Sequence, residues 1–285
     1  MKNVVVVFLL FISANAFGQL GVVKENFSRA DSLRGGLHHE RSCYDVQSYD
    51  LQVTIDTLKK SITGSNKIRF YLLDTASWIQ IDLFENLEIV KIDFEKSNLQ
   101  IHKSGNATFI EFQKTLQKND TFEITIHYKG IPQAAKTPPW DGGFVWKKDA
   151  NGNQWIAVAC QGTGASCWWP CKDHQSDEPA YMTMSFTVPQ GYSCISNGRL
   201  IENTADSINR TETFKWKVNN PINTYNVTFN IGKYVHYYEK YSELDCDFYV
   251  MPQNFNKAKE HFKQVEDMLN CFQTYFGDYL SQRWF

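Results

Sequence analysis

The sequence has no dense run of lysine or arginine, and its charges of opposite sign nearly cancel. It contains 29 Lys and Arg against 31 Asp and Glu, so the formal net charge is −2. Proteins that bind nucleic acid concentrate basic side chains that neutralise the phosphates. We therefore expect no nucleic acid among the partners of this chain.

Long apolar runs are absent after residue 12. Val4–Ile12 is an apolar run that falls far short of the ~20 residues needed to cross a bilayer. It follows Lys2 and precedes an Ala-Asn-Ala triplet at 14–16, as in a signal peptide with its cleavage site. We expect residues 1–18 to be a signal peptide and 19–42 a polar lead-in. The protein should be exported, periplasmic or extracellular, with no membrane anchor.

The sequence also lacks a complete metal-binding motif. Its seven cysteines are odd in number, and Cys167 and Cys171 have no second Cys or His pair at the spacing of a zinc site. Buried thiols or one disulfide are expected instead. The pair His39-Glu40 begins a zinc-protease motif, but Cys43 stands where the second His is required. The sequence therefore predicts no metal ligand in this chain.

The feature present in most of the chain is alternation of apolar and polar residues. In Tyr49–Ile55 every second residue is apolar, which is typical of a strand with one buried face. At least ten such segments follow one another without intervening helices, which predicts a mainly β, antiparallel β-sandwich. Turns are expected at 103–106, at 149–153 and at Asn197-Gly198, where the dipeptide favours a type I′ turn. The predicted strands include 68–72, 79–83, 90–94, 110–112, 122–128, 144–146, 155–159, 182–188, 214–218 and 225–229.

The pattern changes near Met251-Pro252. Apolar residues then recur at intervals of four and three, which predicts one amphipathic helix capped by Asn254 or Asn256 and ended by Gly277. This is the only helix expected after the signal peptide. Its apolar stripe needs a partner surface, for which a second domain outside this chain is a better candidate than the sandwich. The stripe consists of Ala258, Phe262, Val265, Leu269, Phe272 and Phe276.

The segment from Trp155 to Pro179 holds the most unusual residues. Gly162-Thr163-Gly164 lacks the third Gly, the Lys and the helix of a phosphate loop. Ser166 is not in a Gly-x-Ser-x-Gly elbow, because Trp168 occupies the last position. Trp168 and Trp169 are expected to pack in the core rather than to stack on sugars.

Three acidic residues close this segment: Asp173, Asp177 and Glu178. A glycosidase would need two carboxyl groups facing each other across a cleft. Acidic residues in a loop are more often solvated, and a surface loop is the expectation here. His174, beside them, is likewise expected at the surface.

Several short motifs, in order, resemble one known family. They are Cys43–Leu51, Ile62–Ser65, Ala159–Gly162, Trp169–Asp173 and Asp177–Pro179. Together they are similar to the N-terminal region of zinc aminopeptidases of the aminopeptidase-N and leukotriene-hydrolase type, from Tyr44 to about Trp284. The resemblance implies a saddle-shaped β-sandwich domain over residues 43–247. It further implies that residues 248–285 begin a thermolysin-like catalytic domain that this chain does not complete.

The resemblance also implies what each part does. The full-length enzymes hold zinc with His-Glu-x-x-His and a distant Glu, and nothing in this sequence matches those motifs. The chain alone is therefore expected to bind no zinc and to be inactive. Gln161 aligns with the Gln or Glu that anchors the amino terminus of the peptide substrate, and Gly162 leaves room for a side chain. Residues 172–177 lengthen the loop relative to the family pattern.

Two functions follow as hypotheses. The first is the substrate-flanking part of a zinc metallo-aminopeptidase, whose partners are a peptide amino terminus and the missing catalytic domain. The alternative is a non-catalytic, exported β-sandwich module that binds peptide or glycan. The C-terminal helix separates the two, because a self-sufficient module should cover Phe262, Leu269 and Phe276 with its own sheet.

Overall fold

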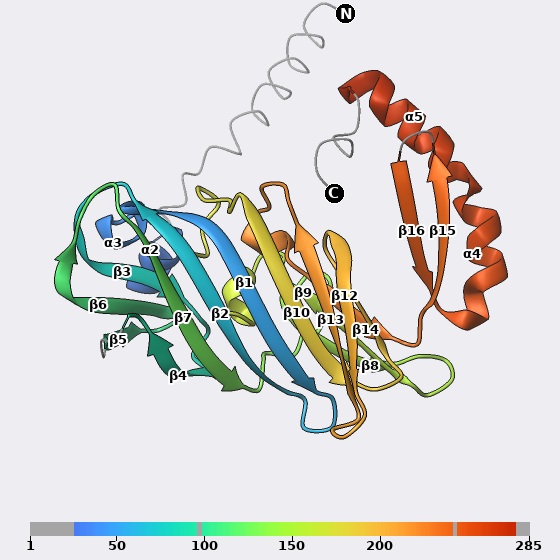
Figure 1. Cartoon of the computed structure of the whole chain (residues 1–285), viewed down its shortest axis with the longest axis horizontal. Coiled ribbons are helices and arrows are strands. Elements are labelled where there is room, and N and C mark those ends of the chain that lie inside the picture. Colours follow the sequence, from blue (N-terminus) through green and yellow to red (C-terminus); the bar gives the residue numbers. More distant parts are fainter. Residues whose placement is uncertain (1–25, 96–98, 242–243, 278–285) are drawn as a thin grey trace, which may run out of the picture.

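The computed structural model describes residues 26–95, 99–241 and 244–277 (Figure 1). The predicted signal peptide, residues 1–18, lies outside the described residues. The chain is mainly β, as the sequence predicts, and most of its strands belong to three sheets. Among the described residues, no helix has the length and apolar character needed to cross a membrane.

The largest sheet has seven strands in the order β12-β13-β10-β1-β2-β7-β4 and forms the long curved layer in Figure 1. Its side chains alternate as predicted: Leu51, Val53 and Ile55 are buried, whereas Gln52 and Thr54 are exposed. The strands are β1 (Tyr44–Asp56), β2 (Ser61–Leu72), β4 (Leu87–Asp93), β7 (Thr121–Gly130), β10 (Tyr181–Pro189), β12 (Arg199–Asp206) and β13 (Thr211–Val218).

Two smaller sheets cover the inner face of the large one. Their orders are β11-β14-β9-β8 and β3-β6-β5. One hydrophobic core joins all three sheets, with Leu51 from the large sheet, Phe229 from the second and Ile110 from the third. The strands are β3 (Ala76–Asp82), β5 (Gln100–Ser104), β6 (Ala107–Leu116), β8 (Gly143–Lys148), β9 (Gln154–Ala159), β11 (Ser193–Ser196) and β14 (Phe229–Gly232).

One strand pair departs from the antiparallel expectation. β1 and β10 lie parallel in the centre of the large sheet, with Leu51 opposite Met184. Parallel neighbours need a crossover rather than a tight turn. Residues 57–180, which contain the strands β2 to β9, form this crossover.

Three local predictions were wrong. Residues 225–229 do not form a strand, because Thr224–Asn226 is the 3₁₀ turn η2 and β14 begins only at Phe229. Val90 is 53% exposed, because a register shift between Ile89 and Lys91 in β4 moves it off the buried face. Asn197-Gly198 does not close a hairpin. It connects β11 to β12, which belong to different sheets, and of the two residues Gly198 alone has a positive φ.

The predicted polar lead-in contains two short helices, which corrects the expectation of a single helix after the signal peptide. They are α2 (Arg29–Gly35) and α3 (His39–Ser42). Ser28 and Asp31 form a capping box that satisfies the free amides at the start of α2. Since α2 buries none of its residues, it has no apolar stripe that periodicity could reveal. His39-Glu40 lies on α3, where His39 bonds the carbonyl of Thr75.

The C-terminal part is a hairpin followed by two helices. β15 (Val235–Tyr241) pairs only with β16 (Leu244–Val250). The predicted single helix is divided into α4 (Phe255–His261) and α5 (Val265–Phe276) by the 3₁₀ turn η4 (Phe262–Gln264). Gly277 ends α5 with φ +88°, as predicted. Asn254 precedes α4 without a side-chain cap.

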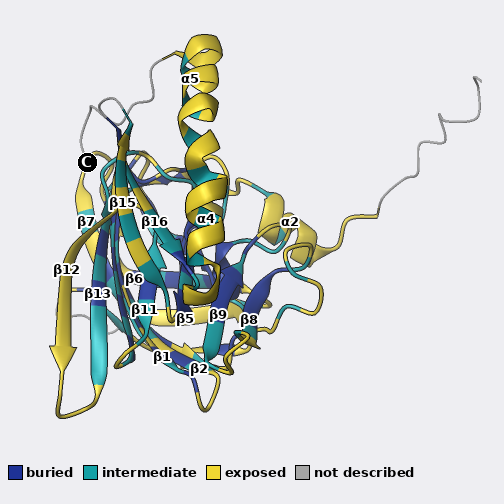
Figure 2. Cartoon of the chain, turned by 90° about the vertical axis from the view of Figure 1, so that its right-hand side faces the viewer, coloured by how far each residue is buried: buried dark blue, intermediate teal, exposed yellow. Residues whose placement is uncertain are grey.

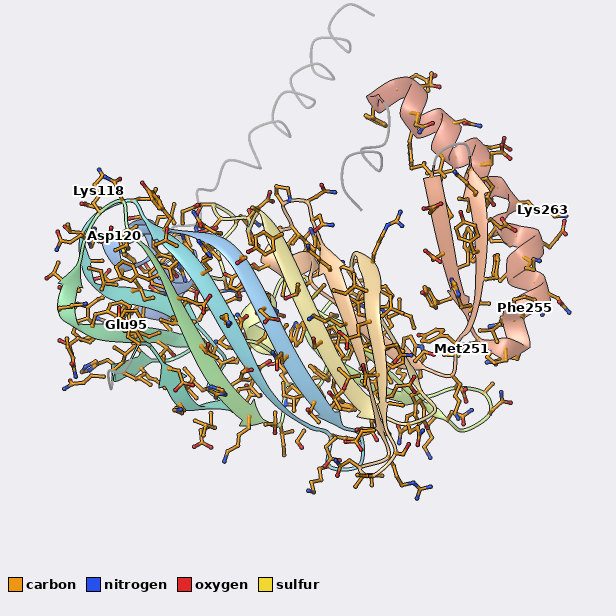
Figure 3. All side chains as sticks on the ribbon, in the orientation of Figure 1. Glu95, Lys118, Asp120, Met251, Phe255 and Lys263 are labelled. Atoms are coloured by element: carbon orange, nitrogen blue, oxygen red, sulfur yellow. The ribbon has the colours of Figure 1, made fainter. Side chains whose placement is uncertain are left out.

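Neither α4 nor α5 buries any of its residues. Figure 2 shows them largely exposed beside the buried strands, and Figure 3 shows Lys263 pointing away from the sheets. Phe262 stacks on Phe248 of the hairpin at 5.3 Å between ring centroids, but Phe272 and Phe276 are 51% and 83% exposed. The sandwich therefore does not cover the apolar stripe.

Candidate functional site

The turn after β9 is held by hydrogen bonds to one carbonyl. The amides of Thr163 and Gly164 both donate to the Cys160 oxygen, at 3.0 and 2.8 Å. Gly162 and Gly164 have φ of +71° and +90°, a region that glycine adopts without steric cost. We call residues 160–164 the Gln161 loop. Its backbone is closed on itself, so the side chain of Gln161 starts from a defined position.

Asp173 fixes the far end of this loop. Its carboxylate accepts hydrogen bonds from the amides of Ala165 and Ser166, at 3.2 and 3.0 Å, and from the Ser166 hydroxyl at 2.6 Å. A Cβ atom on Gly164 would lie 2.2 Å from an Asp173 oxygen. Glycine at 164 is thus required by both its φ and its neighbour.

The two tryptophans behind the loop are fully buried, as predicted. Trp169 meets Tyr49 edge to face at 5.0 Å, and Trp168 meets Phe229 at 5.4 Å. Neither ring is exposed, so neither offers a platform for a sugar. Both rings belong to the hydrophobic core, as does Cys160 at the start of the Gln161 loop.

The acidic loop differs from the expected surface loop. Asp177 is 4% exposed and forms an ion pair with the equally buried Lys172. Its oxygens also accept from the Val46 amide at 3.1 and 3.3 Å. Both carboxylates, Asp173 and Asp177, are engaged by backbone amides, and Asp177 is also paired with Lys172. They are therefore poor candidates for the acid and base of a glycosidase. Glu178 is exposed, as predicted.

Asp82, at the end of β3, joins the loop to the chain before β1. Its carboxylate accepts two bonds from Arg41, at 2.9 and 2.7 Å, and one from the Asp173 amide at 3.1 Å. Burial raises the pKa of Asp82 to about 6, although the Arg41 guanidinium opposes this shift. Arg41 is itself fully buried and Asp82 is 5% exposed, so the pair is almost entirely shielded from solvent.

Above these residues lies a hollow of about 780 Å³. Both predicted site residues, Gln161 and Gly162, line it. Gln161 is exposed, and its amide has no hydrogen-bond partner among the residues that the structure describes. Other walls come from residues 27–35, 173–175 and 223–225. A hollow of this size, with polar groups on apolar walls, suits a small ligand or a chain terminus.

Sequence reasoning missed two of these walls. Asp31 and Arg34 of α2 and Tyr225 all line the hollow, and none was predicted. The Ser28-x-x-Asp31 capping box was the available indication of α2. No local pattern indicates that residues 223–225 approach residues 160–164, since that contact depends on how distant strands pair.

The residues do not form a zinc site. Within the described ranges, no group of three or more His, Cys, Asp or Glu side chains could hold a metal ion. All seven cysteines are unpaired, and five of them are buried. Burial raises the pKa of Cys171 and Cys194 well above the usual thiol value, so both remain protonated at neutral pH and are poor ligands or nucleophiles.

The fold and the site together define a mainly β domain with a hollow of about 780 Å³ beside the Gln161 loop. Comparison with known proteins gives the family: residues 45–226 match the model described as the peptidase M1 N-terminal domain, and the chain belongs to the M1 peptidase family. No curated protein matches the sequence.

Solved structures of M1 zinc metallopeptidases share the fold. A mutant enzyme from Deinococcus radiodurans bound to a Tyr-Ser-Ala substrate aligns with TM-score 0.66 and 19% identity, over 83% of this chain and 54% of that one. A structure of the M1 zinc metallopeptidase from the same organism gives a TM-score of 0.63 and 17% identity over the same shares. A two-domain mutant bound to L-tryptophan gives 0.65 and 18%, again over 83% and 54%. This chain thus spans about half the length of the structures it matches.

Proposed function

We propose that this chain is the N-terminal part of a zinc metallo-aminopeptidase that removes amino-terminal residues from peptides. The observation that carries the proposal is the position of Gln161 and Gly162 on the wall of the hollow. They come from a loop that is closed by hydrogen bonds to the Cys160 carbonyl and is followed by amides held by Asp173. Family membership supports the chemistry, because the similar structures are zinc metallopeptidases, one of them bound to a tripeptide.

In this proposal Gln161 holds the amino terminus of the substrate. Its amide oxygen can accept a hydrogen bond from an ammonium group without placing a second negative charge in the hollow. Gly162 has no atom within 4 Å of where a Cβ would stand, which leaves room beside the amide for a substrate side chain. Gln161 and Gly162 orient the peptide. Hydrolysis itself requires further groups, the zinc ligands among them.

Those groups, including the zinc ligands, lie outside the described residues of this chain. We therefore propose two domains, a sandwich over 43–247 and the beginning of a catalytic domain over 248–285. The uncovered stripe of α5 supports this division, because it leaves Phe272 and Phe276 available to a further domain. It also disfavours the self-sufficient binding module, which should cover that stripe. Export to the periplasm or the extracellular space is a further part of the proposal.

The test begins with the reading frame downstream of codon 285 in the source genome. We expect it to encode His-Glu-x-x-His, and the whole encoded protein, loaded with zinc, to hydrolyse aminoacyl nitroanilides. Replacing Gln161→Ala should raise KM by about tenfold with a smaller change in kcat, since it removes ground-state binding of the amine.

The matched control is Gln100→Ala, an exposed glutamine on β5 that does not line the hollow. It should leave KM and kcat unchanged. Absence of aminopeptidase activity in the whole zinc-loaded protein would contradict the proposed reaction. Equal effects of the two substitutions would contradict the role of Gln161.

A further inference from the structure

We propose that residues 27–36, which we call the N-terminal arm, position the Gln161 loop, and that Arg34 is the positioning residue that acts through Gly162. The inference rests on the proposed function for its consequence in catalysis, but not for its structural claim. The arm precedes residue 45, where the family match begins. It nevertheless contributes Phe27, Asp31, Arg34 and Gly35 to the walls of the hollow.

The arm is anchored by a buried ion pair. Arg41 is 0% exposed and binds Asp82 through two hydrogen bonds. The same guanidinium donates to the carbonyls of Arg34 and Gly36, at 2.8 and 2.9 Å. The C-terminal end of α2 is thereby tied to β3, so the arm has a fixed position although α2 buries no side chain.

From this anchor the arm contacts the Gln161 loop and the segment after it. The Arg34 guanidinium donates a hydrogen bond to the Gly162 carbonyl of the loop. The ring of His174, which also lines the hollow, bonds the Gly35 carbonyl of the arm at 3.2 Å. The carbonyl of Arg34 therefore accepts a hydrogen bond from Arg41, and the side chain of Arg34 donates one to Gly162 of the loop.

The loop has little else to fix it at this point. Gly162 has no side chain, and no atom lies within 4 Å of where its Cβ would stand. The Cys160 carbonyl and the Gly164 amide are joined by a backbone hydrogen bond, and Asp173 holds the next amide, that of Ala165. The Gly162 carbonyl is bound by Arg34. This carbonyl belongs to the 162–163 peptide group, one residue beyond Gln161 in the same turn, so holding it restrains the turn that carries the Gln161 side chain.

Asp82 unites the two halves of this arrangement. One oxygen accepts from both Arg41 and Gln80, and the other from Arg41 and the Asp173 amide. Asp173 in turn holds Ala165 and Ser166 at the end of the loop. The arm, through Arg41, and the loop, through Asp173, are therefore both linked to the buried carboxylate of Asp82. Buried hydrogen bonds thus hold the arm and the loop in position relative to each other.

The test compares Arg34→Ala, Arg34→Lys and the control Arg29→Ala in the whole protein encoded by the gene. Arg29 is on the same helix, is exposed and does not line the hollow. Hydrogen exchange is measured on peptides covering 162–166, whose amides at 163–166 are all hydrogen-bonded. Aminoacyl nitroanilide kinetics are measured on the same samples.

We expect Arg34→Ala to speed exchange of these amides by about tenfold, as loss of a charge-assisted hydrogen bond loosens the turn. KM should rise several-fold with little change in kcat, since Gln161 then loses its orientation. Arg34→Lys should restore part of both, and Arg29→Ala neither.

Unchanged exchange in Arg34→Ala overturns the inference, whatever the kinetics. Faster exchange with unchanged KM overturns it as well, because the arm would then cover the loop without serving the substrate. If the wild-type protein has no aminopeptidase activity, the proposed function fails, while the exchange experiment still decides whether the arm positions the loop.

Discussion

At the scale of single residues, Asp82 has the largest share in holding the candidate site together. It is 5% exposed and accepts hydrogen bonds from two side chains and one backbone amide of three different segments. A buried ion pair adds little net stability, because taking both charges out of water is costly. Removing one member of the pair is strongly destabilising, because the remaining charge is left buried and unpaired.

We therefore predict that Asp82→Asn destabilises the chain by roughly 3–5 kcal/mol, because Arg41 keeps its buried charge and loses its counter-ion. Urea unfolding followed by circular dichroism measures the difference. The control is Asp93→Asn, since Asp93 pairs with Lys91 and His127 at the surface, where solvent screens the charges and the pairs contribute little. Equal effects of the two substitutions would refute the account of Asp82.

The same variant tests the pH dependence. The pKa of Asp82 in the folded state, about 6, exceeds the value near 3.9 of an unfolded aspartate. The folded state therefore binds a proton at Asp82 more readily than the unfolded state does. The stability that this proton contributes is complete below about pH 4 and is lost as the pH rises through 6. Between pH 5 and pH 7 the wild type should lose about 1 kcal/mol of unfolding free energy that Asp82→Asn does not lose.

At the scale of elements, α2 depends on its cap more than on packing. Seven residues are too few for a stable isolated helix, and α2 buries no side chain. Its capping box is made by the Ser28 hydroxyl, which accepts from the Asp31 amide, and the Asp31 carboxylate, which accepts from the Ser28 amide.

We predict that Ser28→Ala costs about 1 kcal/mol of local stability in α2. Hydrogen exchange of the amides in 31–36 should quicken by about fivefold, while that of the strand β1 stays unchanged. Ser28→Asp should recover the protection, because aspartate also caps helices well. A change that spreads to β1 would show that α2 and the sandwich unfold together.

The elements also show how far the sequence alone could lead. Strict alternation in β1, β7 and β10 predicted strands and their buried faces, because each of these strands has one face in the core. Prediction failed where geometry depends on distant partners. The bulge in β4 exposed Val90, and the crossing of the chain between sheets made Asn197-Gly198 a connection rather than a hairpin turn.

The candidate site divides in the same way. Gln161 and Gly162 were found through resemblance to a family, and they line the hollow. Resemblance to the family could not reveal the N-terminal arm, because the arm lies before the matched residues 45–226. Its apolar residues also do not recur at the spacing of an amphipathic helix. Asp177 was misjudged, since a charged residue between polar neighbours gives no indication that Lys172 meets it in the interior.

At the scale of the whole molecule, the 285-residue chain presents an apolar helix face. Met268, Phe272, Tyr275 and Phe276 are 46–83% exposed along α5. Burying each large side chain is worth about 1.5–3 kcal/mol, so the face should associate with another apolar surface when nothing else covers it.

We predict that this chain, expressed alone, self-associates at micromolar concentration, and that the double change Phe272→Glu, Phe276→Glu weakens the association by at least about tenfold. Sedimentation velocity gives the measurement. Ile208→Glu serves as the control, because Ile208 is 92% exposed but lies between β12 and β13, away from α5. A monomeric wild-type chain would contradict the prediction.

The parallel pairing of β1 with β10 has a consequence for the order in which the chain can fold. Leu51 meets Met184, and such a non-local contact cannot form until the residues between have been made and brought round. β2 can pair with β1 early, and β7 and β4 can then extend that side of the sheet. The other edge of β1 stays open for the whole of that interval. An open strand edge is a template for the wrong partner. Synthesis of this domain therefore includes a long period in which β1 needs protection, and the arrival of β10 ends it.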